Sequence, residues 1–275
     1  MNENFFLTRH SMKPKGEDLE SSEFVGISEK GVELAKERAQ EILKDLEQLE
    51  NGTVMLIGGV SEMPRTKSTA MVYGKEIKNL IKEQSRDNVI VLLPEDINEI
   101  KGFTNKVDFI AEQIKANPGK KMILDFPLFM KEFSFKGGWL DDKGNLTDYA
   151  KELLRRNEND EEKAMKDWFD NQGRIEDLVG PSPKEVAEQQ LSGVERLRKF
   201  AKKYISGRPL VIGSVGHSWN LDAVAVYLAN NGEINKESFE RMKAKMIGET
   251  EMIKLSWRDG KQVLEYGDVV IPLEK

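Results

Sequence analysis

The sequence predicts an α/β protein. We expect a mostly parallel central sheet flanked by helices on both faces, an inserted helical and loop cap region, and a C-terminal antiparallel hairpin. Short apolar runs alternate with amphipathic helical segments, which is typical of parallel sheets. The stretch 102–180 interrupts this alternation and is rich in charged, aromatic and glycine residues. Two alternating segments near the C-terminus flank Arg258-Asp259-Gly260, which indicates a hairpin.

The individual elements follow from local signals. Ser28 is a suitable N-cap for an amphipathic helix that stops at Asn51-Gly52. Pro183 suits the first turn of a long helix over 182–205, and Asn231-Gly232 closes a helix that begins near residue 220. A further helix is expected after residue 62. Apolar runs predict strands over 4–8, 53–57, 88–93, 121–126 and 210–215.

Composition excludes several classes of protein. The 275 residues are 39% hydrophobic and 33% charged, suiting one soluble domain, 1–275, with 102–180 inserted in it. No apolar run reaches the roughly 20 residues of a membrane span, and no secretory signal is visible, so we expect a cytoplasmic protein without a membrane partner. A net charge of −6 argues against nucleic acid as a partner. Without cysteine, two histidines do not complete a zinc site, so no metal is expected.

The chemistry-bearing residues recur at the ends of predicted strands. His10 follows the first strand and is preceded by Arg9, and His217 follows a late strand and precedes a helix. Ser61 and Arg65 lie after the second strand, where the next helix begins. Each of these residues taken alone is more often structural. Together they place two imidazoles, two guanidiniums and helix N-termini at one edge of the sheet, where phosphate is commonly held.

Four segments resemble motifs of the histidine phosphatase superfamily, which includes the cofactor-dependent phosphoglycerate mutases. FFLTRHS is similar to its Arg-His signature, and GISEKGVELAKERAQEI resembles its following helix. SEMPRTKSTA and VGHSWNLDAV resemble its later Ser/Arg and His segments. The matches keep family order and cover most of residues 4–80 and 183–228.

The resemblance implies a mechanism. His10 is expected to be the nucleophile, forming a phosphohistidine that water then hydrolyses. Arg9, Arg65 and His217 are expected to surround the transferring phosphoryl group, and Ser61 either adds a hydrogen bond to it or caps the loop. A neutral His10 requires one ring nitrogen to act as a donor, for instance to a backbone carbonyl. Neither a metal nor an organic cofactor is implied.

The general acid is expected on the segment PEDINEI. Its INEI part resembles the family's acid-bearing segment and indicates Glu99. Glu95 and Asp96 are close competitors, and a solvated acidic turn is the alternative.

Departures from the family narrow the activity. The loop after His10 carries Lys13 and Lys15 but no Arg, which favours hydrolysis over a mutase reaction. Ser218 and Trp219 follow His217 where the acid phosphatase branch usually has Asp. The expected activity is a phosphomonoesterase acting on a small phosphorylated substrate or a phosphoprotein. A phosphomutase and a catalytically weak phosphate-binding module are the alternatives. The aromatic residues of 102–180 form either a small core of their own or a lid that selects substrate.

Overall fold

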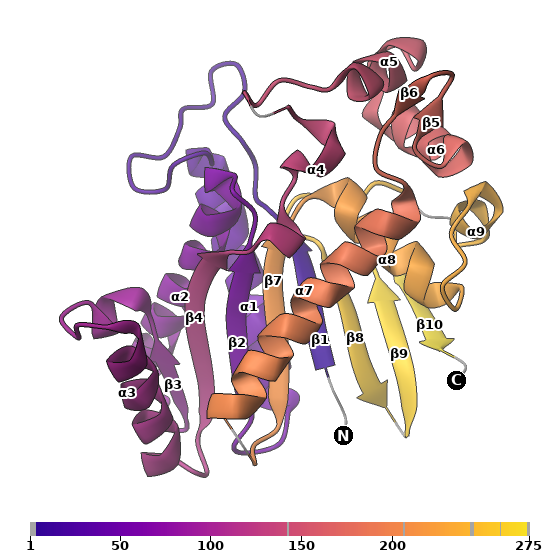
Figure 1. The fold of residues 1–275 in the computed structure, drawn as a ribbon. Coiled ribbons are helices and arrows are strands. Elements are labelled where there is room, and N and C mark those ends of the chain that lie inside the picture. The colour runs from indigo at the N-terminus through magenta and orange to yellow at the C-terminus, as the bar shows by residue number, and fades with distance from the viewer. Residues whose placement is uncertain (1–3, 142, 206, 243–244, 259, 274–275) are drawn as a thin grey trace.

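The computed structural model of the protein describes residues 4–141, 143–205, 207–242, 245–258 and 260–273. An eight-stranded sheet with the order β10-β9-β8-β1-β7-β2-β4-β3 forms its centre (Figure 1). The strands are β1 (Asn4–Arg9), β2 (Val54–Val60), β3 (Val89–Leu92), β4 (Lys121–Phe129), β7 (Leu210–Gly216), β8 (Met252–Arg258), β9 (Lys261–Tyr266) and β10 (Val269–Leu273). The five strands from β1 to β3 pair in parallel, whereas β8, β9 and β10 pair antiparallel. The predicted fold class is confirmed, and Asp259 of the predicted turn lies outside the described residues.

Helices cover both faces of the sheet because the strands alternate their apolar side chains. In β1, Phe6 packs into the core beneath α1 (Glu29–Gln48) and α2 (Pro64–Glu83). Its neighbours Phe5 and Leu7 belong to the opposite core, which α7 (Pro183–Tyr204) and α8 (Ser218–Ala229) cover. Ser28 caps α1, and Ser182 with Glu185 forms a capping box at the start of α7. Both N-caps stand where the sequence places the helix starts.

Strand β4 occupies a position that the sequence does not reveal. It lies between β2 and β3, so β3 is the outermost strand on that side. The short helix η1 (Pro94–Ile97) and α3 (Phe103–Ala116) connect β3 to β4. Thus α3 and β4, which fall within the predicted inserted region 102–180, belong to the central layers. Within the predicted insertion, only the described residues after β4 rise above the sheet edge, and this segment continues to 182.

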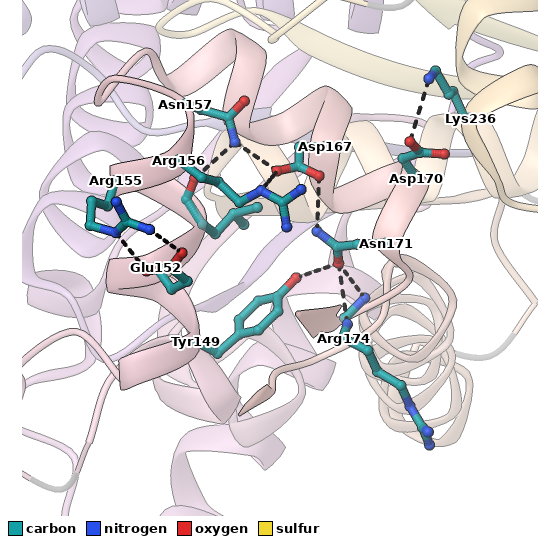
Figure 2. Close-up of polar contacts among 12 residues, drawn as sticks. Tyr149, Glu152, Arg155, Arg156, Asn157, Asp167, Asp170, Asn171, Arg174 and Lys236 are labelled. Atoms are coloured by element: carbon teal, nitrogen blue, oxygen red, sulfur yellow. Dashed lines mark hydrogen bonds and ion pairs between the residues drawn. The ribbon is translucent and has the colours of Figure 1, made fainter. Parts of the chain in front are cut away.

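Short helices and one small hairpin make up this segment 131–182. They are η2 (Lys131–Phe133), α4 (Lys136–Trp139), α5 (Asp148–Arg156), α6 (Glu161–Asn171), β5 (Arg174–Ile175) and β6 (Leu178–Val179). Polar contacts join α5 to α6, where Asp167 accepts from Asn157 at 2.7 Å and pairs with Arg156 at 3.1 Å (Figure 2). Lys236 of α9 (Lys236–Arg241) pairs with Asp170 of α6 at 3.4 Å. Exposed pairs of this kind contribute little stability.

Aromatic packing fixes the segment to the rest of the protein. The Trp139 ring lies 5.1 Å from the Trp168 ring and 5.0 Å from that of Trp219 in α8. Phe169 packs against Phe239 of α9 at 4.6 Å. Since Trp168 and Phe169 are fully buried, this cluster is continuous with the core on the α7–α8 face.

Candidate active site

Three neighbouring strands bring the candidate residues together. His10 follows β1, Ser61 follows β2, and His217 follows β7, which lies between them. Because these strands are parallel, their carboxyl ends meet at one edge of the sheet. Arg65 stands in the first turn of α2 and reaches the same edge. Of the residues expected from the sequence, the structure brings together His10, Ser61, Arg65 and His217.

Hydrogen bonds hold the His10 ring in one tautomer. Its Nδ1 lies 2.7 Å from the carbonyl oxygen of Ser11, and its Nε2 accepts from Nε of Arg65 at 2.9 Å. Because the guanidinium only donates, the ring proton belongs on Nδ1 and the lone pair on Nε2. Ser11 is fixed in turn by Thr69 Oγ1, which accepts from its backbone N–H at 2.9 Å. Burial, followed by the charge of Arg65, lowers the pKa of His10 to about 3, so the ring is neutral at ordinary pH.

A second network orients His217. Its Nδ1 faces Nη2 of Arg65 at 3.4 Å, so its proton belongs on Nε2, which lies 2.8 Å from Ser61 Oγ. Ser61 Oγ also accepts from the N–H of Met63, and its own proton is directed to Thr66 Oγ1 at 3.1 Å. Thr66 donates to the carbonyl of Met63 at 2.8 Å, which completes a chain in which every donor has an acceptor. Ser61 therefore positions His217 in this structure.

The two rings and the guanidinium between them form an anion-binding arrangement. The ring centroids of His10 and His217 are 5.2 Å apart, and Arg65 contacts both rings. Burial lowers the pKa of His217 well below its usual value, with further contributions from His10 and Arg65. The pocket thus holds two neutral imidazoles, each with a lone pair facing the Arg65 cation, which suits nucleophilic attack on a bound phosphoryl group.

Arg9 is engaged elsewhere. Its Nη1 donates to the carbonyl of Ile247 at 2.6 Å, and its Nη2 pairs with Glu249 at 3.2 Å. Its Nε is buried without a hydrogen-bond partner among the described residues. The charge of Arg9 still contributes to lowering the pKa of His10 and of His217. Arg9 therefore adjoins the pocket, with its guanidinium held by the loop that precedes β8.

That loop is fixed by a buried carboxyl group on α8. Asp222 Oδ1 accepts from the N–H of Ile247 at 3.1 Å and lies 2.7 Å from Tyr266 Oη. Tyr266 Oη also contacts the carbonyl of Lys245, and a single hydroxyl proton serves both contacts poorly. Tyr266 donates to Asp222 Oδ1, and Oδ2 of Asp222 is buried without a hydrogen-bond partner among the described residues, a position that favours the neutral carboxyl group. Burial raises the pKa of Asp222 to about 8, opposed by the Tyr266 hydrogen bond, in agreement with this arrangement.

Asp222→Asn is expected to change how stability depends on pH. The raised pKa means that the folded state binds a proton that the unfolded chain releases near pH 4. The stabilisation that this bound proton gives to the folded state is therefore fully present below pH 4. It is lost as pH rises toward 8, by at most about 1.4 kcal/mol per pH unit. Urea unfolding of both proteins at pH 5, 7 and 9 measures this. The free energy of unfolding of the variant should increase relative to that of wild type as pH rises. A difference that does not change with pH would contradict the raised pKa of Asp222.

Glu99 is not brought to the other candidates. It is exposed and follows η1, beyond the edge strand β3, and Figure 1 shows the connection from β3 to α3 on the outer side of β3. Glu95 and Asp96 of η1 are also exposed. Asp96 accepts from the N–H of Leu93 at 2.7 Å and pairs with Lys78. No hydrogen bond or ion pair within the described ranges joins Glu95, Asp96 or Glu99 to His10.

Two residues outside the strand-end set also lie at the pocket. The Phe135 ring lies 4.6 Å from the His217 ring, so the segment 131–182 reaches the site. The backbone N–H of Phe135 donates to Glu62 Oε2 at 3.3 Å. The concentration of aromatic residues in this part of the sequence was the available signal for Phe135. Glu62 carried no signal beyond its place beside Ser61.

Within the described ranges, no three His, Asp or Glu side chains gather where they could hold a metal ion. None of the helices described combines the length and apolar character needed to cross a membrane.

Comparisons with known proteins support the fold. No protein-family model and no curated protein matches the sequence. Among solved structures, mycobacterial glucosyl-3-phosphoglycerate phosphatase with inorganic phosphate is similar, with a TM-score of 0.51, 15% identity and 97% of each chain covered. The same enzyme with VO3 gives 0.50 and 16%, covering 95% of this chain and 96% of that one. A mycobacterial hydrolase gives 0.50 and 15%, with 98% of both chains covered.

At these identities the likeness establishes the fold. The chain shares the fold of the solved glucosyl-3-phosphoglycerate phosphatase. The resemblance noted in the sequence is confirmed at that level.

Proposed function

We propose that this protein is a phosphomonoesterase that hydrolyses a phosphate ester through a phosphohistidine on His10. The observation that carries the proposal is the His10 tautomer. Nδ1 is held by the Ser11 carbonyl, and the lone pair of Nε2 faces Arg65. A neutral, oriented imidazole beside a cation is a competent nucleophile toward phosphorus. The fold shared with solved phosphatases supports this activity.

The site residues divide the work of binding and transfer. When a phosphate group enters the pocket, Arg65 donates to it in place of His10 Nε2. The lone pair of Nε2 is then free for in-line attack. Arg65 then contacts the phosphoryl oxygens, and His217 does so once Nδ1 is also protonated, because its Nε2 proton is held by Ser61. Arg9 adds positive charge from its place beside Glu249. Ser61 fixes the orientation of the His217 ring through the 2.8 Å contact between Oγ and Nε2. Hydrolysis of the phosphohistidine by water completes the cycle.

The substrate class is a small phosphorylated molecule. The enclosure of the pocket by Phe135 favours a compact substrate over a folded phosphoprotein. The similar mycobacterial enzyme is named for a small phosphorylated compound, glucosyl-3-phosphoglycerate, which supports this class without specifying the compound.

The proposal is tested with the purified full chain and 4-nitrophenyl phosphate in the presence of a metal chelator. Turnover that vanadate inhibits is expected. A chain that binds inorganic phosphate but shows no turnover would be a phosphate-recognising module. Turnover that requires an added divalent metal would contradict the mechanism.

The segment 131–182 is proposed to select substrate, and Phe135→Ala tests this. Removing the ring that covers His217 opens the pocket wall. The ratio of kcat/KM between a bulky and a small phosphate ester is expected to change by roughly 10-fold or more, the size typical of a lost apolar contact. Affinity for vanadate should change far less.

Phe103→Ala is the matched control. Phe103 is also aromatic but is exposed at the start of α3, and its ring contact is with Phe200. Its substitution should leave the ratio unchanged. An equal loss on all substrates for Phe135→Ala, with an unchanged Tm, would contradict a selective role.

A further inference from the structure

The position of β4 separates Glu99 from the nucleophile. In the order β1-β7-β2-β4-β3, four inter-strand steps lie between the strand that carries His10 and the strand before Glu99. At about 4.8 Å per step, the two strand ends are roughly 19 Å apart. A general acid must come within hydrogen-bond reach of the leaving oxygen, about 3 Å. Glu99 is exposed, and no hydrogen bond or ion pair in the described residues joins it to the site, which favours a nearer carboxyl group.

Three carboxyl groups in the described part of the chain interact with the site arginines, and one of them, Asp222, is fully buried and bound to the loop before β8. Glu249 pairs with Arg9 at 3.2 Å and lies in the loop before β8. Glu62 lies directly after Ser61, and its charge acts on Arg65, which contacts both histidines. Glu249 is therefore committed to the cation on the β8 side, whereas Glu62 is beside the guanidinium at the centre of the pocket.

A backbone hydrogen bond holds Glu62 beside Phe135, next to the site. Its Oε2 accepts from the N–H of Phe135, whose ring lies 4.6 Å from the His217 ring. Glu62 is half-buried, whereas His10 is only 7% exposed. In an in-line displacement the leaving oxygen departs on the side opposite the attacking nitrogen. Because His10 is the more buried of the two, the leaving oxygen should depart toward the more exposed side of the site, the side on which we place Glu62.

We propose that Glu62 is the general acid and base of the reaction, an inference that rests on the proposed phosphatase function. As the lone pair of His10 Nε2 forms the N–P bond, the P–O ester bond breaks and its electron pair passes to the leaving oxygen. The Glu62 carboxyl gives its proton to that oxygen, which leaves as an alcohol. In the second step the Glu62 carboxylate takes a proton from water, the water oxygen bonds to phosphorus, and the N–P electron pair returns to Nε2.

Glu62→Gln tests the proposal because the amide keeps the shape and the hydrogen bond from Phe135 but has no acidic proton. Under single-turnover conditions, phosphoenzyme formation from an alkyl phosphate should slow by roughly 10²–10⁴-fold. Reaction with 4-nitrophenyl phosphate, whose leaving group departs without a proton, should slow far less. Glu62→Asp should recover part of the alkyl rate. Glu83→Gln, at the exposed far end of α2, is the matched control and should behave as wild type.

The same measurements on Glu99→Gln and Glu249→Gln decide between the candidates. If either shows the leaving-group-dependent loss and Glu62→Gln does not, the assignment to Glu62 is overturned. Equal slowing of both substrates by Glu62→Gln would reduce Glu62 to a residue that positions Arg65, which also overturns it. Failure of the phosphatase proposal itself is distinguishable, because the wild-type chain would then form no phosphoenzyme with either substrate.

Discussion

Replacing His10 by alanine is expected to abolish turnover and the acid-labile labelling of the chain by a phosphorylated substrate. The atom that would form the covalent bond is Nε2, which carries the lone pair. No other described group occupies its place between Ser11 and Arg65. The loss should be on the order of 10⁶-fold in kcat, the size typical for removing the nucleophile of a covalent mechanism. Rapid-quench labelling with a radioactive phosphate ester measures both effects.

Folding and binding controls separate this loss from a distorted pocket. The side-chain hydrogen bonds of His10 stay within the site, with Ser11 and Arg65, so the variant should unfold near the wild-type Tm. Arg65 and His217 remain, and vanadate should still bind to the variant, though more weakly. Normal turnover in His10→Ala would exclude His10 as the nucleophile. Turnover that persists without labelling would favour direct attack by water.

The sequence predicts the central layers well because their signals are local. Alternation in β1, the Ser28 cap of α1 and the Ser182–Glu185 box of α7 each depend on neighbours in the chain. Strand order is different in kind. The run at 121–129 indicates a strand, yet nothing local states that it pairs with both β2 and β3. That pairing decides how far Glu99 lies from His10.

The candidate site also contains residues that local sequence predicts and residues that depend on remote contacts. His10, Arg65 and His217 come together because each follows a strand, and those strands are neighbours in the sheet. The partners of Arg9 could not be found, since Ile247 and Glu249 belong to a loop remote in sequence. The same holds for Glu62, whose contact with Phe135 depends on how the segment 131–182 folds over the sheet edge.

Substitutions of Arg65 should separate its geometry from its charge. Arg65→Lys keeps the positive charge, but one ammonium group cannot reproduce the contacts of Nε with His10 and of Nη2 with His217. Arg65→Gln loses both the paired guanidinium contacts and the positive charge. Each variant is expected to lose about 10²–10³-fold in kcat, as for the removal of an oriented donor to the transition state. Lys67→Gln, exposed on the same helix, serves as the control and should retain wild-type kcat.

The pH dependence of kcat/KM distinguishes the two Arg65 variants. Burial is the main reason that the pKa of His10 falls to about 3, and the charge of Arg65 is the second. Activity requires neutral His10, so it is lost as pH falls through this pKa. Arg65→Lys should leave the acid limb where it is in wild type, because the charge remains. Arg65→Gln should move the limb to higher pH, though still below the usual pKa of histidine, since His10 stays buried. If both variants move it equally, the second cause is the hydrogen bond to Nε2 rather than the charge, and if neither does, the acid limb belongs to a group other than His10.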